Sequence, residues 1–281
     1  MILQNKNAII YGGGGGIGGG VARTFAREGA RVFLVGRTLD KLQAVAADIE
    51  AAGGLADVAV VDVLDEQAIN EHARAVAAKA GSVDVSMNLI THGDDHAGGY
   101  VQGVPLVDIP VEDFFRPITK AVKANYITAQ AAARLMTNQK SGVILTLTNA
   151  GSQGGMPLMG STGVAASAIE LFALYLASEV GEYGVRVCGL RIAAVPELWS
   201  PEIRTHVFDW PPKEQDNTTG AGAGQGGMDA VGLVRLLADR TMLRRPTTLA
   251  QVADTAAFLA SDLAGGITAT FANVTGGMVQ D

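Results

Sequence analysis

Short apolar runs alternate along this chain with longer segments in which apolar residues recur at helical spacing. The short runs predict strands over residues 8–11, 30–35, 55–61, 83–90, 142–148, 185–192 and 269–274. The longer segments predict a helix that begins near residue 21 and helices over residues 39–52, 66–80, 111–137, 164–182 and 249–260. This alternation favours a parallel sheet covered by helices on both faces, and right-handed crossovers make such a sheet doubly wound. Neither a repeat nor a dividing linker interrupts it, so we expect a single α/β domain over residues 1–281.

The first predicted strand leads into a glycine-rich turn, in which only one of residues 12–20 is not glycine. Glycine lets a backbone approach a diphosphate closely, and a helix N-terminus offers free N–H groups and a partial positive charge. A flexible loop would also be rich in glycine, but the strand before and the helix after this turn favour a Rossmann-type dinucleotide cradle. The registers Gly12-x-x-x-Gly16-x-Gly18 and Gly14-x-Gly16-x-x-Gly19 both fit. The cofactor-binding residues predicted here are Gly12, Gly14, Gly15, Gly16, Ile17 and Gly18.

The end of the second predicted strand distinguishes between nicotinamide cofactors. An acidic residue about 20 positions after the glycines would bond a ribose 2′-hydroxyl, whereas an arginine there can pair with a 2′-phosphate. The chain has Gly36 and Arg37 at this place, which predicts NADP(H), with NAD(H) less favoured. A solvent-exposed surface arginine is the alternative. Asp62 and Val63 end the third predicted strand, where they can reach an adenine, although Asp62 would serve equally as a helix cap.

Composition and charge restrict the class of protein. Apolar residues make up 48% of the 281 residues, which is enough for a sizeable core. The net charge of −7 argues against nucleic acid or an anionic membrane surface as the main partner. The single Cys188 excludes an internal disulfide framework and is typical of a reducing compartment. With no apparent signal peptide and no uninterrupted apolar run of about 18 residues, we expect a cytoplasmic protein without a membrane span.

The order and spacing of several motifs resemble the short-chain dehydrogenase/reductases over most of the chain. The motifs are the glycine turn, Gly36-Arg37, Asp62-Val63, Asn88, Asn125-Tyr126-Ile127, Arg245-Pro246 and Asn273-Val274-Thr275-Gly276-Gly277. The resemblance implies NAD(P)(H) binding, hydride transfer between cofactor and a carbonyl or alcohol, and usually a tetramer. It also implies that Asn88 and Val195 contact the cofactor and that Asn125 belongs to the catalytic set.

The other catalytic positions depart from that family. Its members carry a serine after the fifth strand and a Tyr-x-x-x-Lys pair on the following helix, where the lysine lowers the pKa of the tyrosine. Aligned through the later part of this helix, the serine falls on Asn149, the tyrosine on Thr162 and the lysine on Ala166. No lysine occurs between Lys140 and Lys213, so realignment does not restore the motif. We therefore predict that Asn149 and Thr162 polarise the substrate oxygen.

Two motifs beside the expected nicotinamide are altered as well. The usual Asn-Asn-Ala-Gly reads Asn88-Leu89-Ile90-Thr91, and the usual Pro-Gly reads Ile192-Ala193, followed by Val195-Pro196-Glu197. The adenine half of the cofactor site therefore keeps the family pattern, whereas its reactive half is rebuilt.

Two long segments stand out beside these motifs. The first, 91–103, is an insertion that contains His92, Asp94, Asp95 and His96. Two histidines and two aspartates can hold a metal, but a glycine-rich solvated loop is the commoner outcome, and we predict no metal. As a functional role for the segment we expect His92 to act as the replacement acid. The second segment, 196–227, stands where the family keeps its substrate lid. Its Trp199, Phe208 and Trp210 either line a substrate pocket or pack the lid down.

These features lead to one functional hypothesis and two alternatives. The hypothesis is an NADP(H)-dependent oxidoreductase with a non-standard active site, acting on a carbonyl, an alcohol or a related small molecule. The alternatives are a cofactor-binding pseudoenzyme and a non-redox enzyme such as a lyase or cyclase. The predicted helix over 164–182 is apolar nearly all round, which indicates burial on more than one side. We therefore expect a homo-tetramer, or at least a dimer, unless this helix is buried within one subunit.

Overall fold

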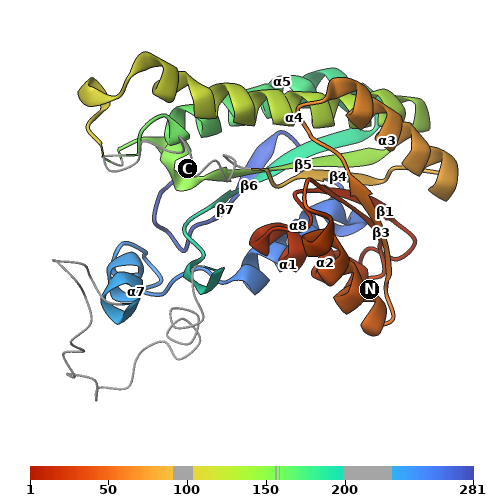
Figure 1. The fold of residues 1–281 in the computed structure, drawn as a ribbon, viewed down its shortest axis with the longest axis horizontal. Helices are drawn as coiled ribbons and strands as arrows, with labels where there is room; N and C mark the ends of the chain where they lie inside the picture. Colours follow the sequence, from red (N-terminus) through yellow and green to blue (C-terminus); the bar gives the residue numbers. More distant parts are fainter. Residues whose placement is uncertain (91–103, 156, 158, 199–229) are drawn as a thin grey trace.

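In the computed structural model, which describes residues 1–90, 104–155, 157, 159–198 and 230–281, the strands form one parallel sheet (Figure 1). The strands are β1 (Asn7–Tyr11), β2 (Arg31–Gly36), β3 (Leu55–Val60), β4 (Val85–Asn88), β5 (Gly142–Asn149), β6 (Val185–Ile192) and β7 (Thr270–Val274). The helices are α1 (Gly16–Arg27), α2 (Leu39–Ala51), α3 (Glu66–Ala80), α4 (Val111–Gln139), α5 (Thr162–Val180), α7 (Ala230–Asp239) and α8 (Leu249–Ala260). Short 3-10 helices include η1 (Leu106–Asp108), η2 (Ala150–Gln153), η3 (Gly181–Tyr183), η4 (Pro196–Leu198) and η6 (Asp262–Ala264).

The sheet has the order β3-β2-β1-β4-β5-β6-β7, so the chain reverses its direction of growth between β1 and β4. Every neighbouring pair of strands is parallel, and Tyr11 at the end of β1 is in register with Asn88 at the end of β4. All strands therefore end at the same edge. In open α/β sheets, ligands bind outside the carboxyl ends of the strands at such a switch point. The expected doubly wound single domain is confirmed.

Helices cover both faces of the sheet because its strands are apolar on both sides. In β1, Ala8 and Ile10 pack in the core shared with α1, α2 and α8, whereas Ile9 and Tyr11 pack in the core shared with α3, α4 and α5. Figure 1 shows these two helical layers on opposite sides of the sheet. The layers leave the carboxyl ends of the strands as the place where a ligand can enter.

The predicted elements are present, with differences at their ends. The helix expected near Val21 begins at Gly16, because the glycines of the turn adopt helical geometry despite their low helix propensity. The strand expected over 83–90 is shorter and ends at Asn88, whose side chain bonds the backbone of Ile90 at 2.8 Å. Helix α7 lies beyond the segment expected to be irregular and had no counterpart in the prediction. Segment 91–103 and most of 196–227 lie outside the described residues.

One stretch among the described residues, Thr162–Tyr183, has the length and mean hydropathy, 1.4, of a candidate membrane span. It comprises α5 and η3. Ala173, Ala177 and Val180 of α5 are buried in the core shared with the strands, and Ala165 and Ile169 are buried against α4. Packing in the core explains the apolar residues on the inner side of this helix, whereas Leu171 and Tyr175 on its outer side are exposed.

Candidate functional site

The glycine turn joins β1 to α1 at the switch point of the sheet. Gly12 has φ +82°, a conformation that favours glycine, and its N–H donates to the carbonyl of Val35 at 2.8 Å. A Cβ on Gly18 would lie only 2.0 Å from the carbonyl oxygen of Gly12. The turn therefore packs directly on the first turn of the helix. This geometry matches the register Gly12-x-x-x-Gly16-x-Gly18.

The start of α1 is open to solvent. Gly15 and Gly16 are exposed, and Gly15 at the N-cap has no side chain to bond the first N–H groups of the helix. Those N–H groups have no acceptor within the helix and carry the positive end of its dipole. A Cβ at Gly16 would lie 3.1 Å from the Leu198 side chain, so there is little room for a side chain at this position. The cradle is therefore narrow, and its glycines present only backbone atoms. Such a cradle fits a diphosphate, and Ile17 lies partly buried beside it.

Arg37 and Asp62 follow neighbouring strands at the same edge. Gly36 and Val60 are in register, and the N–H of Val61 donates to the carbonyl of Gly36 at 3.0 Å. Arg37 is exposed, and within the described part of the chain it forms neither a hydrogen bond nor an ion pair. Its guanidinium is thus available to an anion beside the first half of the sheet.

Asp62 is not the cap of α3, contrary to one of the two interpretations made from the sequence. Its Oδ1 accepts from the N–H of Leu64 at 3.0 Å, within a turn. The cap is Asp65, whose Oδ1 accepts from the N–H of Ala68 at 3.0 Å. Val63 between them is buried, so it also anchors the turn to the core.

Asn88 and Asn125 are turned into the protein. Asn88 is 5% exposed, and its amide donates to the hydroxyl of Thr128 on α4 at 2.9 Å. Asn125 is 3% exposed, and its amide donates to the carbonyl of Ala121 at 2.9 Å. The Asn88 side chain therefore ties β4 to α4, whereas the Asn125 side chain bonds within α4.

Asn88 also belongs to a buried polar row that the sequence analysis missed. Register places Tyr11, Asn88 and Thr146 side by side on β1, β4 and β5. The hydroxyls of Tyr11 and Thr146 are buried and have no hydrogen-bond partners within the described part of the chain. Burial raises the pKa of Tyr11, which makes this phenol a poor acid. The three residues come from strands that are far apart in the chain. Only the pairing of those strands brings them together, so the sequence alone does not reveal the row.

The loop after β5 brings Asn149 and Thr162 to the same region. Asn149 ends β5 and accepts from the N–H of Gly151 at 2.9 Å. A Cβ on Gly163 would lie 2.5 Å from the carbonyl oxygen of Gly151, so this loop rests on the first turn of α5. Thr162, the first residue of α5, is 4% exposed. Val195 is buried just after β6, while His92 lies outside the described residues.

A buried ionic cluster lies beside this loop. Arg191 on β6 donates to both carboxylate oxygens of Glu170 on α5, at 3.1 and 2.8 Å, and to the hydroxyl of Ser152 at 3.0 Å. It also pairs with Asp281, while Thr148 donates to Glu170 at 2.7 Å. The side chains of Arg191 and Glu170 are only 7% and 13% exposed. The cluster thus joins β5, β6, α5 and η2.

This cluster lies next to the expected catalytic positions. Glu170 is one helical turn beyond Ala166, and Thr148 directly precedes Asn149. The hydrogen bonds to Glu170 raise the pKa of Arg191 and outweigh the opposing effect of burial. The sequence analysis did not single out either residue, although an arginine near the end of an apolar strand and a glutamate in the middle of an apolar helix were available signals.

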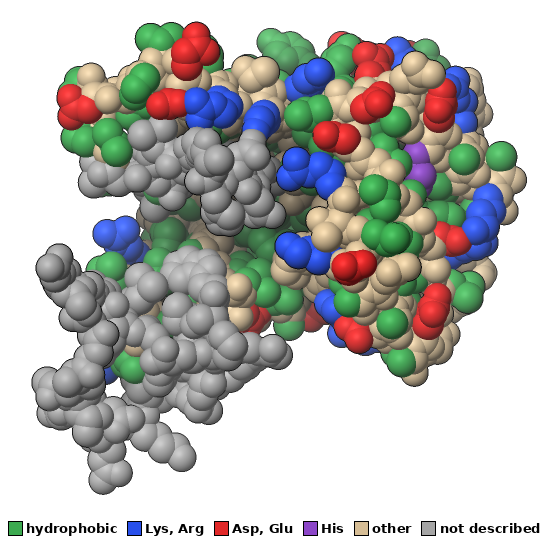
Figure 2. Space-filling model, viewed as in Figure 1, with side chains coloured by type: hydrophobic (Ala, Val, Ile, Leu, Met, Phe, Trp, Pro, Cys, Tyr) green, Lys and Arg blue, Asp and Glu red, His purple; other side chains and the backbone are tan. Residues whose placement is uncertain are grey.

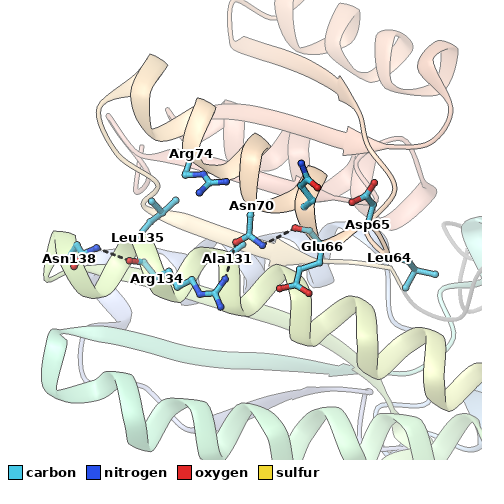
Figure 3. Close-up of a pocket in the computed structure, with 10 residues that line it drawn as sticks. Leu64, Asp65, Glu66, Asn70, Arg74, Ala131, Arg134, Leu135 and Asn138 are labelled. Atoms are coloured by element: carbon cyan, nitrogen blue, oxygen red, sulfur yellow. Dashed lines mark hydrogen bonds between the residues drawn. The ribbon is translucent and has the colours of Figure 1, made fainter.

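A groove with a volume of about 820 Å³ lies between α3 and α4 (Figure 3). Polar side chains along it bond within the protein: Arg134 donates to Asn70 at 3.3 Å, and Asn70 donates to the carbonyl of Glu66 at 2.8 Å. Leu64 and Asp65 line one end of this groove, near Asp62, but most of it runs along the two helices. We therefore place the candidate site at the strand ends, where Figure 2 shows a hollow with hydrophobic side chains inside it and Lys or Arg side chains beside it.

Known proteins share this chain's sequence and fold. The 7alpha-hydroxysteroid dehydrogenase of Escherichia coli (strain K12) is 28% identical over 284 residues, which cover 99% of this chain and 96% of that protein. A solved 7 alpha-hydroxysteroid dehydrogenase, complexed with NADH and 7-oxo glycochenodeoxycholic acid, has a TM-score of 0.77 at 27% identity, covering 99% of this chain and 96% of its own. A short-chain type dehydrogenase/reductase from Mycobacterium ulcerans, 24% identical, shares the fold with a TM-score of 0.81, covering 99% of this chain and 91% of its own.

A family model agrees with these relatives. The model described as enoyl-(acyl carrier protein) reductase, a short-chain dehydrogenase model, matches residues 13–196. The match begins within the glycine turn and extends to the segment after β6, so it includes most of the candidate site. Together with the single doubly wound domain, it shows that the chain belongs to the short-chain dehydrogenase/reductase family.

Proposed function

We propose that this member of the family is an NADP(H)-dependent oxidoreductase acting on a carbonyl or alcohol group of a small molecule. The observation that carries the proposal is the bare glycine cradle at the switch point, where the exposed N-terminus of α1 faces the strand ends. Gly12, Gly14, Gly15, Gly16, Ile17 and Gly18 would hold the diphosphate, and Asp62 and Val63 would flank the adenine. A bound nicotinamide supplies the hydride chemistry.

Arg37 supports the preference for NADP(H). It follows Gly36, so no carboxylate stands at the strand end to bond a 2′-hydroxyl or repel a 2′-phosphate. We expect Arg37→Ala to weaken NADPH binding by about tenfold or more, the value of a hydrogen bond to a charged group, and to leave NADH binding unchanged. Calorimetric titration of both cofactors measures this. Arg27→Ala, which removes an exposed arginine that pairs with Asp254, is the matched control. Tighter binding of NADH than of NADPH by the parent protein would contradict the preference.

The catalytic assignments are also proposals. The Asn149 amide and the Thr162 hydroxyl would donate hydrogen bonds to the substrate oxygen. Asn125 would belong to the same catalytic set, with its buried amide bonded to the Ala121 carbonyl one turn earlier in α4. Neither an amide nor a hydroxyl is a good acid, so His92 would supply the proton. Ala166 stands where the family has its catalytic lysine. It is buried and carries no charge, so it cannot perform the role of that lysine.

Turnover separates this function from a cofactor-binding pseudoenzyme. We expect slow oxidation of NADPH with members of a carbonyl panel, or reduction of NADP⁺ with alcohols. General acids contribute on the order of a hundredfold, so His92→Ala should reduce the rate by at least about tenfold. NADPH affinity should not change. A parent protein that binds NADPH yet turns over no substrate in either panel would favour the pseudoenzyme instead.

The outer face of α5 supports assembly into a dimer or tetramer. Leu171 and Tyr175 are 56% and 65% exposed, and the exposed Tyr126 of α4 contacts Phe172 with ring centroids 5.8 Å apart. We propose that these two helices meet their symmetry mates. Light scattering at micromolar concentration should show a dimer or tetramer, and Leu171→Glu should lower the mass. Leu55→Glu, at a residue 64% exposed on β3, should not. A monomeric parent protein would refute the assembly.

We also propose a cytoplasmic location. Cys188 is a free, buried cysteine, and burial raises the pKa of its thiol. A free, buried thiol with a raised pKa reacts slowly and does not require a disulfide partner. It is therefore compatible with a reducing compartment.

A further inference from the structure

Glu197 is a buried acidic residue in η4, just after β6. It is 8% exposed. Its Oε1 accepts a hydrogen bond from the N–H of Leu249, the first residue of α8. Its Oε2 is buried and has no hydrogen-bond partner among the residues that the structure describes. A buried carboxylate oxygen that lacks a donor costs free energy. A purely structural role therefore explains the burial of Oε1, which bonds Leu249, but not the burial of Oε2.

Contacts with α1 place Glu197 beside the glycine cradle. The neighbouring Leu198 lies against Gly16, and Leu249, which bonds Glu197, lies against Gly20 one turn further on. The segment also follows the carboxyl end of β6, in the half of the sheet beyond the switch point. The two halves of a doubly wound sheet bind the two nucleotides of a dinucleotide. Arg37 lies on the first half of the sheet and Glu197 follows a strand of the second half, so Glu197 lies on the side where the second nucleotide would bind.

The charge of Glu197 has little compensation from the protein. Among the described residues it forms no ion pair, and the hydrogen bond from Leu249 places it at the N-terminal end of α8, whose dipole is positive there. A nicotinamide cofactor brings two charges to this region. Its diphosphate is negative in both redox states, whereas its ring is cationic when oxidised and neutral when reduced. A buried carboxylate therefore distinguishes the two states only through the ring.

We propose that Glu197 is a specificity-determining residue that favours binding of the oxidised nicotinamide cofactor over the reduced one. The inference rests on the proposed dinucleotide function. It assigns the uncompensated carboxylate an electrostatic role toward the cofactor, in addition to its bond to α8. The consequence is that the bound reduced cofactor gives up its hydride more readily, because hydride transfer to a carbonyl restores the cationic ring that the carboxylate stabilises.

The test is the ratio of two dissociation constants, Kd for NADP⁺ over Kd for NADPH, measured by calorimetry. Glu197→Gln removes the charge and keeps an oxygen that can accept from Leu249. We expect the ratio to rise by about tenfold, the order of effect of removing one unit charge near a cationic group in a partly buried site. Changes in packing or in repulsion of the diphosphate affect both forms equally, so they cancel in the ratio.

Two further variants make the result specific. Glu197→Asp keeps the charge and should leave the ratio close to that of the parent protein. Asp48→Asn removes a charge from an exposed side chain of α2, where solvent and salt screen it, and should also leave the ratio unchanged. An unaltered ratio in Glu197→Gln, with both forms still bound, would overturn the role of the charge alone. A parent protein that binds neither form would overturn the dinucleotide function, and this inference with it.

Discussion

Glu170→Ala is expected to lower the free energy of unfolding by about 3–5 kcal/mol, the usual cost of breaking a buried ion pair. The variant leaves Arg191 in a site where its side chain is 7% exposed, with Asp281 and Ser152 as its remaining partners. It also removes the acceptor of the Thr148 hydroxyl. The Arg191 guanidinium and the Thr148 hydroxyl thus both lose a partner in a place that water does not reach. Urea denaturation at a fixed protein concentration measures the effect.

An exposed ion pair provides the matched control. Asp48→Ala breaks the pair with Arg23, whose N···O distance of 2.6 Å is as short as that of the buried pair. Because those side chains are 44% and 59% exposed, water replaces the lost partner. The cost should therefore stay below about 1 kcal/mol. Similar losses in the two variants would show that burial of the Arg191 cluster contributes nothing particular.

A double replacement separates the charges from the space they occupy. Replacing both Glu170 and Arg191 by methionine removes the pair but keeps much of its volume. Such replacements of buried ion pairs are often neutral or stabilising. The double variant should therefore be more stable than Glu170→Ala. If it is equally unstable, the cluster stabilises the protein through its shape and contacts with η2, rather than through pairing.

Gly18→Ala is expected to weaken NADPH binding by at least about tenfold and to destabilise the fold by about 1–3 kcal/mol, the usual cost of overpacking. The added Cβ would lie 2.0 Å from the carbonyl oxygen of Gly12, and backbone cannot yield as a side chain can. The turn must then separate from α1, which opens the proposed diphosphate cradle. Calorimetry and denaturation of the same sample measure the two effects.

The next residue of the chain supplies the control for this variant. A Cβ on Gly19 would approach the end of the flexible Arg23 side chain at 2.9 Å, which can move aside. Gly19→Ala should therefore retain most NADPH affinity and benefit from the better helix propensity of alanine. The opposite order, with Gly19→Ala the more damaging, would favour the register Gly14-x-Gly16-x-x-Gly19 instead.

Local patterns in the sequence determined most of the fold. The alternation of apolar runs and helical periodicity determined the strands and helices, because each depends on residues close together in the chain. α3 and β6 occur at the predicted residues. The glycine turn was also visible beforehand, since the need for glycine at Gly12 and Gly18 is a property of the local backbone. The family resemblance added the order of the motifs along the chain, and membership of the family is confirmed.

Only the tertiary structure decided the partners of the polar side chains. Arg191 and Glu170 are 21 residues apart, and Glu197 bonds a residue 52 positions away. Asp62 and Asp65 both precede α3, and the actual path of the chain decided which of them caps it. Neither a periodicity nor a motif contains such pairings, because they depend on how strands and helices pack once the chain is folded. The candidate active site is built from these pairings, so the sequence located it while the fold determined its charges and hydrogen bonds.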